Sequence, residues 1–192
     1  LPDFTPGSHI DIIMDNGKTR SYSLVNNPTD KNRYLIAILR EHDGKGGSSW
    51  MHKNISNGDL LKITTPKNDF KLTNKASSYL FIAGGIGITP ILSMGHHLRN
   101  KNANSFLHYC TRTRQKTPFL KEASTIFKGD VSFYHDNGDP SKGIDLKEIL
   151  KNRKDGQHLY ICGPRGLIDA ALIAASDWPE GTVHFELFSS NK

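Results

Sequence analysis

The stretch from Tyr79 to Met94, YLFIAGGIGITPILSM, constrains the fold of this chain more than any other segment. It begins with an apolar run whose length fits a buried parallel strand. Thr89 is expected to cap a helix whose first residue is Pro90. A strand, a glycine turn and a helix N-terminus in this order predict a binding site for an anion, above all a diphosphate. The glycines lack a Cβ, which permits a tight turn and close approach of another molecule; they are Gly84, Gly85 and Gly87.

Beyond residue 75, strand patterns alternate with helical patterns. This alternation predicts an α/β domain over residues 75–192, with a five-stranded parallel, doubly wound sheet. Ligands of such sheets bind at the carboxyl ends of the strands, so the residues that follow each strand are expected to share one edge. The expected strands are 79–83, 105–110, 131–135, 158–162 and 183–187, and the expected helices are 90–99, 118–127, 146–152 and 166–175.

Residues 1–74 contain short strand patterns separated by turn residues, which predict a small antiparallel β-barrel. A hairpin turn is expected at Asp15-Asn16-Gly17, and a short helix around Trp50 with Ser48 or Ser49 as its N-cap. A polar linker at 73–78 is expected to join this domain to the second one. The expected strands are 8–13, 20–25, 33–40 and 60–64.

Composition narrows the functional class. The net charge is +6, but the basic residues are scattered, which favours a basic surface for phosphorylated cofactors and an acidic redox partner over nucleic-acid binding. No apolar run approaches the ~20 residues that span a bilayer. Two cysteines, Cys110 and Cys162, imply no disulfide framework and fit a cytoplasmic protein. The nine histidines show no metal-ligand spacing, so we expect no metal site.

The pentapeptide Arg20-Ser21-Tyr22-Ser23-Leu24 is a candidate site for a phosphorylated aromatic cofactor. Residues two apart on a strand share a face, so Arg20 and Tyr22 are expected to point the same way. Arginine binds phosphate through two parallel hydrogen bonds, and tyrosine offers a flat ring and a hydroxyl. The alternative is an ordinary barrel strand that carries one surface arginine.

A second phosphate site is expected in the loop GKGGSS, residues 44–49. Consecutive backbone N–H groups and a helix N-terminus can hold a terminal phosphate there. The alternative is a flexible hairpin loop, which glycine and serine also favour. The residues expected to bind are Gly46, Gly47, Ser48 and Ser49.

Together, the pentapeptide and the turn Gly84–Pro90, GGIGITP, resemble motifs of the ferredoxin-reductase-like flavoenzymes. The string from Arg40 to Ser48, REHDGKGGS, is similar to the branch of phthalate dioxygenase reductase and vanillate O-demethylase reductase. The resemblance covers nearly the whole chain and implies flavin on the barrel and nicotinamide on the α/β domain. It implies FMN rather than FAD, and NADH as the donor. Arg112 and Arg114 leave NADPH open, because either could meet a 2′-phosphate.

The resemblance also implies roles for particular residues. Ser23 is expected near flavin N5, and Cys162 of the motif Ile-Cys-Gly-Pro is expected to place its thiol near the nicotinamide; the alternative for Cys162 is a buried core cysteine. Phe188 is expected to cover the flavin, whereas Phe185 is expected to pack in the core. The complete set expected to bind cofactors is Arg20, Tyr22, Ser23, Leu24, Ala37, Ile38, Leu39, Gly46, Gly47, Ser48, Ser49, Gly84, Gly85, Gly87, Thr89, Thr111, Arg112, Cys162, Gly163, Pro164 and Phe188.

The function implied is that of an NADH-dependent reductase that passes electrons through FMN to an iron–sulfur acceptor of an aromatic-ring or demethylating oxygenase. Two alternatives remain: a stand-alone flavin reductase or diaphorase, and a flavin- or nucleotide-binding module without turnover. The expected partner is a ferredoxin-type domain or an oxygenase component, and the expected state is a monomer that binds neither nucleic acid nor membrane. The resemblance implies a further barrel strand before Leu1 and a 2Fe-2S ferredoxin domain beyond Phe188, so we expect a fragment. Two cysteines cannot supply the four thiolates of a plant-type cluster.

Overall fold

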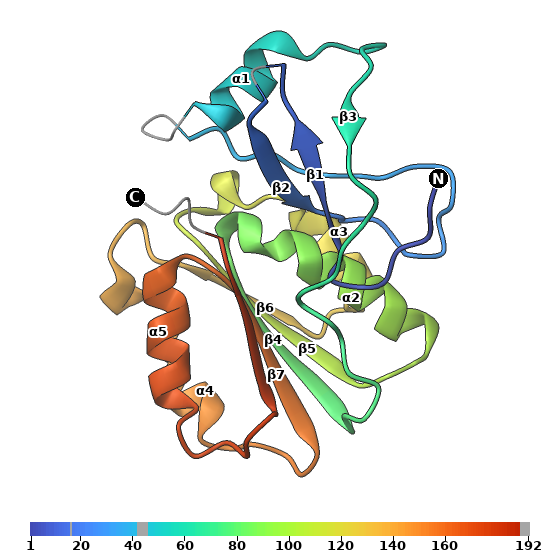
Figure 1. Ribbon diagram of the computed structural model, residues 1–192. Coiled ribbons are helices and arrows are strands. Elements are labelled where there is room, and N and C mark those ends of the chain that lie inside the picture. The colour runs from blue at the N-terminus through green and yellow to red at the C-terminus, as the bar shows by residue number, and fades with distance from the viewer. Residues whose placement is uncertain (16, 42–45, 189–192) are drawn as a thin grey trace.

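The computed structural model describes residues 1–15, 17–41 and 46–188 (Figure 1). It contains a five-stranded sheet in the order β6-β5-β4-β7-β8 and a three-stranded sheet in the order β2-β1-β3. All pairs of neighbouring strands in the first sheet are parallel, and those in the second are antiparallel. The predicted five-stranded parallel, doubly wound sheet is therefore confirmed, and the predicted antiparallel strands form a three-stranded sheet where a small β-barrel was expected.

The parallel sheet follows the predicted strands closely. The apolar runs were a strong signal, because central parallel strands are buried on both faces and their sequences are continuously apolar. β4 lies at the centre of the sheet, and its residues 79–84 are buried. The chain order reverses between β4 and β7, which marks the edge where ligands bind in folds of this kind. The strands are β4 (Ser78–Gly84), β5 (Ser105–Thr111), β6 (Val131–His135), β7 (Gln157–Gly163) and β8 (Val183–Leu187).

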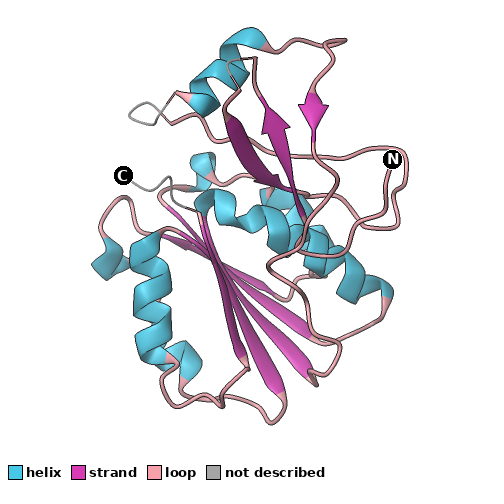
Figure 2. Ribbon diagram, viewed as in Figure 1, coloured by secondary structure: helices cyan, strands magenta, loops and turns pink. Residues whose placement is uncertain are grey.

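Helices cover both faces of this sheet (Figure 2). One face carries α2 (Ile88–Asn100) and α3 (Leu120–Ile126), and the other carries α4 (Leu146–Leu150) and α5 (Arg165–Ala174). Short 3₁₀ turns occur at η1 (Gly85–Gly87), η2 (Arg114–Lys116) and η3 (Pro140–Lys142). None of the described helices is both long and apolar enough to cross a bilayer.

The start of α2 differs from the prediction. Gly87 is the N-cap and Ile88 the first helical residue, so the expected cap at Thr89 and helix start at Pro90 are wrong. The Thr89 hydroxyl instead donates to the carbonyl oxygen of Ile86 at 3.0 Å. The physical reason is that η1 already winds the chain into a helical turn, so α2 continues directly from it without a side-chain cap.

The antiparallel sheet consists of β1 (His9–Ile13), β2 (Thr19–Ser23) and the short strand β3 (Lys62–Ile63). β1 and β2 form the predicted hairpin, with Ile10 opposite Tyr22. Its turn includes residue 16, which lies outside the described residues. β3 is shorter than the predicted strand 60–64.

The strand expected at 33–40 is absent, which corrects the prediction. The segment meets the end of β2 through one backbone bond, from the Val25 N–H to the Leu35 carbonyl at 2.8 Å. The Asn26 side chain then makes the hydrogen bonds that a neighbouring strand would otherwise make with this segment. Its Oδ1 accepts from the Leu35 N–H at 2.9 Å, and its Nδ2 donates to the Arg33 carbonyl at 3.1 Å. Alternation of apolar residues therefore occurs here without a strand.

Helix α1 (Gly47–Asn54) forms where a short helix was predicted, but its cap is Gly46 rather than Ser48 or Ser49. Gly46 has a φ of 83°, a left-handed conformation that glycine adopts without strain. The two serines lie inside the first turn, and their hydroxyls bond to the backbone of Glu41 instead. The expected serine cap is therefore wrong.

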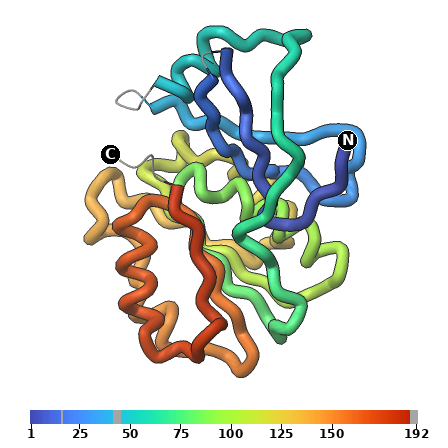
Figure 3. Tube along the Cα trace, in the orientation of Figure 1, coloured from blue at the N-terminus to red at the C-terminus, as the bar shows by residue number. Residues whose placement is uncertain are grey.

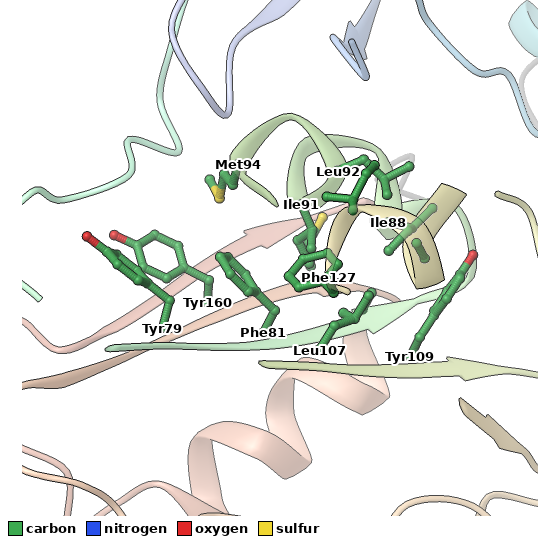
Figure 4. Packing of buried hydrophobic residues seen from close by; sticks show 14 of the residues in the cluster. Tyr79, Phe81, Ile88, Ile91, Leu92, Met94, Leu107, Tyr109, Phe127 and Tyr160 are labelled. Atoms are coloured by element: carbon green, nitrogen blue, oxygen red, sulfur yellow. The ribbon is translucent and has the colours of Figure 1, made fainter. Parts of the chain in front are cut away.

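One apolar cluster joins the two sheets. It lies between α2, α3 and the parallel sheet (Figure 4), and it includes Val25 and Phe70 from the first half of the chain. The chain between the sheets is also fixed: the Thr73 N–H donates to the Tyr160 hydroxyl at 2.8 Å, and the Tyr79 hydroxyl donates to the Thr73 carbonyl at 2.8 Å. The antiparallel sheet thus lies beyond α2 and the carboxyl ends of the parallel strands (Figure 3).

Candidate functional site

The glycine turn after β4 packs directly against the end of β7. A Cβ added at Gly87 would lie 2.3 Å from the backbone oxygen of Cys162, and one added at Gly163 would lie 2.9 Å from the Cα of Gly84. The two backbones therefore approach at a distance that no side chain permits. Around Gly85, which has a φ of +53°, there is open space on the Cβ side. The turn is closed toward β7 and open toward solvent, as a surface that receives a diphosphate requires.

Tyr109 of β5 holds this turn in place, and the sequence prediction missed it. Its hydroxyl lies 3.0 Å from the carbonyl oxygens of both Gly85 and Pro118, and it can donate to either. The tyrosine is fully buried, and its hydroxyl points away from the packed core toward the turn (Figure 4). A buried tyrosine next to a predicted strand end is the signal that could have identified it, because a buried hydroxyl needs a partner.

A polar group closes the carboxyl ends of β5 and β6. The Thr111 hydroxyl lies 2.7 Å from the Thr117 hydroxyl and 2.9 Å from His135 Nδ1. His135 Nε2 is buried and has no hydrogen-bond partner among the described residues. Arg112 follows directly and is exposed. The predicted pair of Thr111 and Arg112 thus lies at the same sheet edge as the glycine turn, since Gly84 aligns with Cys110 across the β4–β5 pair.

Cys162 lies at the end of β7 and is fully buried within the apolar cluster that joins the two sheets. Burial, with a smaller effect from Glu186, raises the pKa of this thiol well above its usual value, so the sulfur remains protonated. A protonated, enclosed thiol can shape a binding surface but is a poor nucleophile. This environment fits a positioning role better than covalent chemistry.

Glu186 of β8 aligns with Cys162 across the β7–β8 pair, and the sequence prediction missed it. Its Oε2 is enclosed and has no hydrogen-bond partner among the described residues. Burial first, and the charge of Asp69 second, raise the pKa of this carboxyl to about 7. An acidic residue among the apolar residues of a predicted strand was the available signal.

The second part of the site lies between β2 and the N-terminus of α1. The Arg20 side chain lies against the first turn of this helix, because a Cβ added at Gly47 would lie 2.5 Å from Arg20 Nε. The guanidinium and the helix N-terminus thus present positive charge together, a proximity that the two separate motifs did not reveal. Tyr22 lies two residues along the strand, and burial raises the pKa of its hydroxyl, which remains a neutral donor.

The expected phosphate loop is only partly described, since residues 42–45 of the string REHDGKGGS lie outside the described residues. Within the described part, the Ser48 hydroxyl accepts from the Glu41 N–H at 3.1 Å, and the Ser49 hydroxyl donates to the Glu41 carbonyl at 3.3 Å. These hydroxyls therefore fasten the helix start to the preceding segment. The free donors at this end are the first backbone N–H groups of α1, which no helix can satisfy internally.

Some of the expected flavin and nicotinamide residues meet in the apolar cluster that joins the two sheets. Ala37 and Phe188, both expected at the flavin, pack against the same cluster that contains Cys162 and Ile88. Ser23 is buried at the end of β2, just before Val25 of that cluster. Three of the expected residues, Ala37, Cys162 and Phe188, therefore meet in this cluster.

Other expected residues lie less directly at this region. Leu24 is fully buried in a separate small cluster of the antiparallel sheet, so its side chain belongs to that core. Leu39 is 54% exposed, and the Ile38 carbonyl lies 2.9 Å from His52 Nε2. Pro164 caps the start of α5 and is exposed.

Phe185 corrects the prediction that it packs in the core. Its side chain is 53% exposed. It alternates with His184 and Glu186, so it lies on the opposite face of β8 from them. β8 is an edge strand of the sheet, and the helices of that face do not cover it fully.

Two hollows occur away from this region. One of about 440 Å³ is lined by residues of 140–147 and α5, and one of about 640 Å³ lies beside the β1–β2 hairpin, α1 and β3. Neither is lined by a residue expected to bind flavin or nicotinamide. The convergence of motifs at the sheet edge, rather than cavity size, therefore identifies the candidate site.

Known proteins resemble this chain in sequence and in structure. A family model described as an oxidoreductase NAD-binding domain matches residues 81–172. The phthalate dioxygenase reductase of Burkholderia cepacia is 42% identical over 192 residues, which are 99% of this chain and 60% of that protein. The vanillate O-demethylase oxidoreductase of Pseudomonas putida is 38% identical over 189 residues, which are 97% of this chain and 60% of that protein.

A solved structure of phthalate dioxygenase reductase, described as modular for electron transfer from pyridine nucleotides to [2Fe-2S], matches with a TM-score of 0.95 and 40% identity. The match covers 100% of this chain and 60% of that chain. The chain is therefore similar, over nearly its whole length, to phthalate dioxygenase reductase and to vanillate O-demethylase oxidoreductase. It spans 60% of the length of the two curated relatives named above. The family match at 81–172 contains the glycine turn, Tyr109 and Cys162, which are residues that shape the sheet edge.

Proposed function

We propose that this chain is the flavin- and nicotinamide-binding part of an oxygenase reductase, which passes electrons from NADH through FMN to an iron–sulfur acceptor. The single observation that carries the proposal is the apolar cluster that joins the two sheets, because it brings Ala37 and Phe188 together with Cys162. Hydride transfer requires two stacked rings, and a region where both half-sites meet is what such stacking needs. The reductase relatives support this direction of electron flow.

The residues present fit both cofactors. Arg20 and the start of α1 form a cradle that a Cβ at Gly47 would fill, and they would hold a terminal phosphate. The glycine turn and α2 would hold the dinucleotide diphosphate. The phosphate cradle that the described residues form beside β2 supports FMN rather than FAD. We further propose that residues 1–74 form the flavin domain and residues 75–192 the nicotinamide domain.

The chain itself supplies binding and orientation rather than a general acid or base. When bound, flavin supplies the chemistry that accepts a hydride and returns electrons singly. Arg20 fixes one end of the site by charge, and Ser23 contributes from the buried end of β2. The protonated thiol of Cys162 limits how deeply a nicotinamide ring can enter the site. Phe188 limits the entry of water where β8 ends.

The test is to purify the protein, record its visible spectrum, release and identify the flavin, and titrate it anaerobically with NADH. We expect bound FMN that bleaches on titration. Arg20→Ala is expected to lower flavin occupancy by about tenfold at limiting flavin, since a charged hydrogen-bond donor to phosphate is removed. Arg33→Ala is the control, because that exposed arginine pairs with Asp30 instead. Full flavin occupancy in Arg20→Ala would contradict the phosphate assignment, and a bound flavin that does not bleach would contradict the reductase function.

A further inference from the structure

The chain passes from the antiparallel sheet to the parallel sheet between β3 and β4. Asn68 is tied to the antiparallel half of the chain, because its Nδ2 donates to the Pro6 carbonyl at 2.9 Å. Ser77 is tied to the start of β7, because its N–H donates to the Gly156 carbonyl at 2.8 Å. We call residues 69–76, which lie between these two points, the connecting segment. Its conformation influences how one sheet lies relative to the other.

Two tyrosines of the parallel sheet hold the middle of the connecting segment. The Tyr160 hydroxyl accepts from the Thr73 N–H at 2.8 Å, and the Tyr79 hydroxyl donates to the Thr73 carbonyl at 2.8 Å. The Tyr160 hydroxyl also donates to the Lys71 carbonyl at 3.3 Å. Both backbone polar groups of Thr73 are therefore bonded to side chains of the parallel sheet. We call Tyr79 and Tyr160 the tyrosine pair.

The surroundings of the tyrosine pair keep it in one orientation. Tyr79 of β4 and Tyr160 of β7 lie on neighbouring strands, and their hydroxyls point in the same direction (Figure 4). Tyr160 is fully buried and Tyr79 nearly so. The His184 ring stacks on Tyr160 with centroids 4.4 Å apart, and His184 Nε2 lies 3.0 Å from His158 Nδ1. Burial raises the pKa of both tyrosines, that of Tyr160 to about 12, so both hydroxyls stay protonated at neutral pH.

Other contacts between the two halves are less directional. Val25 joins the apolar cluster of the parallel sheet, and Phe70 packs edge-on against Tyr160 with ring centroids 5.6 Å apart. Apolar burial is non-directional, so such contacts hold the halves together without fixing an angle. The polar contact from Asn100 Nδ2 to Asn27 Oδ1 is long at 3.5 Å. Hydrogen bonds weaken steeply when donor and acceptor are misaligned, so the short bonds to Thr73 constrain the angle more strongly.

We propose that Tyr79 and Tyr160 are positioning residues, which fix the antiparallel half against the parallel sheet and so set how a nicotinamide ring meets a flavin. The inference rests on the proposed function, because it concerns the alignment of these two rings. Neither tyrosine is among the residues expected to bind a cofactor; both act through Thr73. A displacement of about 1 Å that originates far from the reacting atoms can slow a reaction about 100-fold, so a small shift of one sheet has a large effect on the rate.

The test measures hydride transfer and binding separately in Tyr79→Phe, Tyr160→Phe and the double variant. In stopped-flow reduction of the FMN-loaded protein at saturating NADH, we expect the limiting rate of the double variant to fall about tenfold or more. The Kd values for FMN and for 5′-ADP, each measured alone by isothermal titration calorimetry, should change by less than about twofold. The long-wavelength charge-transfer absorbance of the reduced protein with NAD⁺ should weaken, because it depends on the overlap of the two rings.

A second measurement needs no cofactor. In Tyr160→Phe the Thr73 N–H loses its acceptor, so we expect its amide hydrogen exchange, followed by NMR, to accelerate about tenfold or more. The amides in the middle of β4 should exchange as they do in the unmodified protein, because their exchange requires a wider opening of the sheet. Unchanged exchange at Thr73 would overturn the inference.

Tyr134→Phe is the matched control. The Tyr134 hydroxyl bonds to His108 Nδ1 at 3.0 Å between β5 and β6, so this variant removes a tyrosine hydrogen bond without touching the connecting segment. An equal loss of rate in the control would overturn the inference, since general destabilisation would then explain the loss. An unchanged rate in the double variant, or weaker binding that accounts for the slower rate, would overturn it and leave the proposed function standing. A bound flavin that NADH does not reduce in the unmodified protein would overturn both.

Discussion

Glu186→Gln should make the folded protein more stable at alkaline pH. The Glu186 carboxyl is enclosed beside Cys162 without a hydrogen-bond partner among the described residues, and burial raises its pKa from an ordinary 4.5 to about 7. A tenfold change in proton affinity is worth ~1.4 kcal/mol. Keeping this carboxyl ionised in the folded state therefore costs at most about 3 kcal/mol. Glutamine has the same shape and cannot ionise.

The direction in which the free energy of unfolding changes with pH follows from proton binding. Between pH 4.5 and about 7 the unfolded chain loses this proton while the folded chain keeps it, so the free energy of unfolding falls as pH rises. Below pH 4.5 the carboxyl is neutral in both states and contributes no penalty. Above pH 7 the penalty is complete. The unmodified protein should therefore lose stability through this range, and Glu186→Gln should lose less.

The assay is urea unfolding at several pH values from 4.5 to 8.5, on samples matched for flavin content. The variant should exceed the unmodified protein by a margin that grows with pH to about 3 kcal/mol. Glu180→Gln, at an exposed position, is the control and should change stability by no more than about 0.5 kcal/mol at any pH. A constant difference between Glu186→Gln and the unmodified protein across the range would refute the argument.

Two further substitutions test the sheet edge. Gly87→Ala places a Cβ 2.3 Å from the backbone oxygen of Cys162, so we expect a loss of about 1–3 kcal/mol in urea unfolding. Gly166→Ala, where a Cβ meets nothing within 4 Å, is the matched control, and equal stability of the two variants would contradict the packing argument. Cys162→Ala should slow reduction by NADH in stopped-flow measurements without releasing flavin. Unchanged kinetics would remove any role for the thiol.

Much of the parallel sheet could be predicted because its signals are local. The five strands were predicted to within one residue at each end, since buried parallel strands read as short apolar runs between turn residues. The helix starts were less predictable. At Gly46 and Gly87 the cap is a glycine, whereas nearby Ser48, Ser49 and Thr89 carried the usual cap signal but bond elsewhere.

Other errors arose where the partner of a segment decides its structure. Residues 33–40 alternate like a strand, but Asn26 satisfies the backbone that a neighbouring strand would pair with. Phe185 reads as a core residue, but β8 is an edge strand and leaves it half exposed. Neither the neighbour of a strand nor the coverage of a sheet edge can be read from the segment itself.

The sequence by itself determined the alternation of strands and helices, the glycine turn and the pentapeptide at β2, because these depend on residues a few positions apart. Only the tertiary structure decided that Arg20 lies against Gly47, that Tyr109 bonds to Gly85 and that Glu186 aligns with Cys162. These contacts join residues far apart in the chain, so they follow from strand order and packing. The strand order therefore creates the candidate site, because it brings motifs that are each local in the sequence to one edge of the parallel sheet.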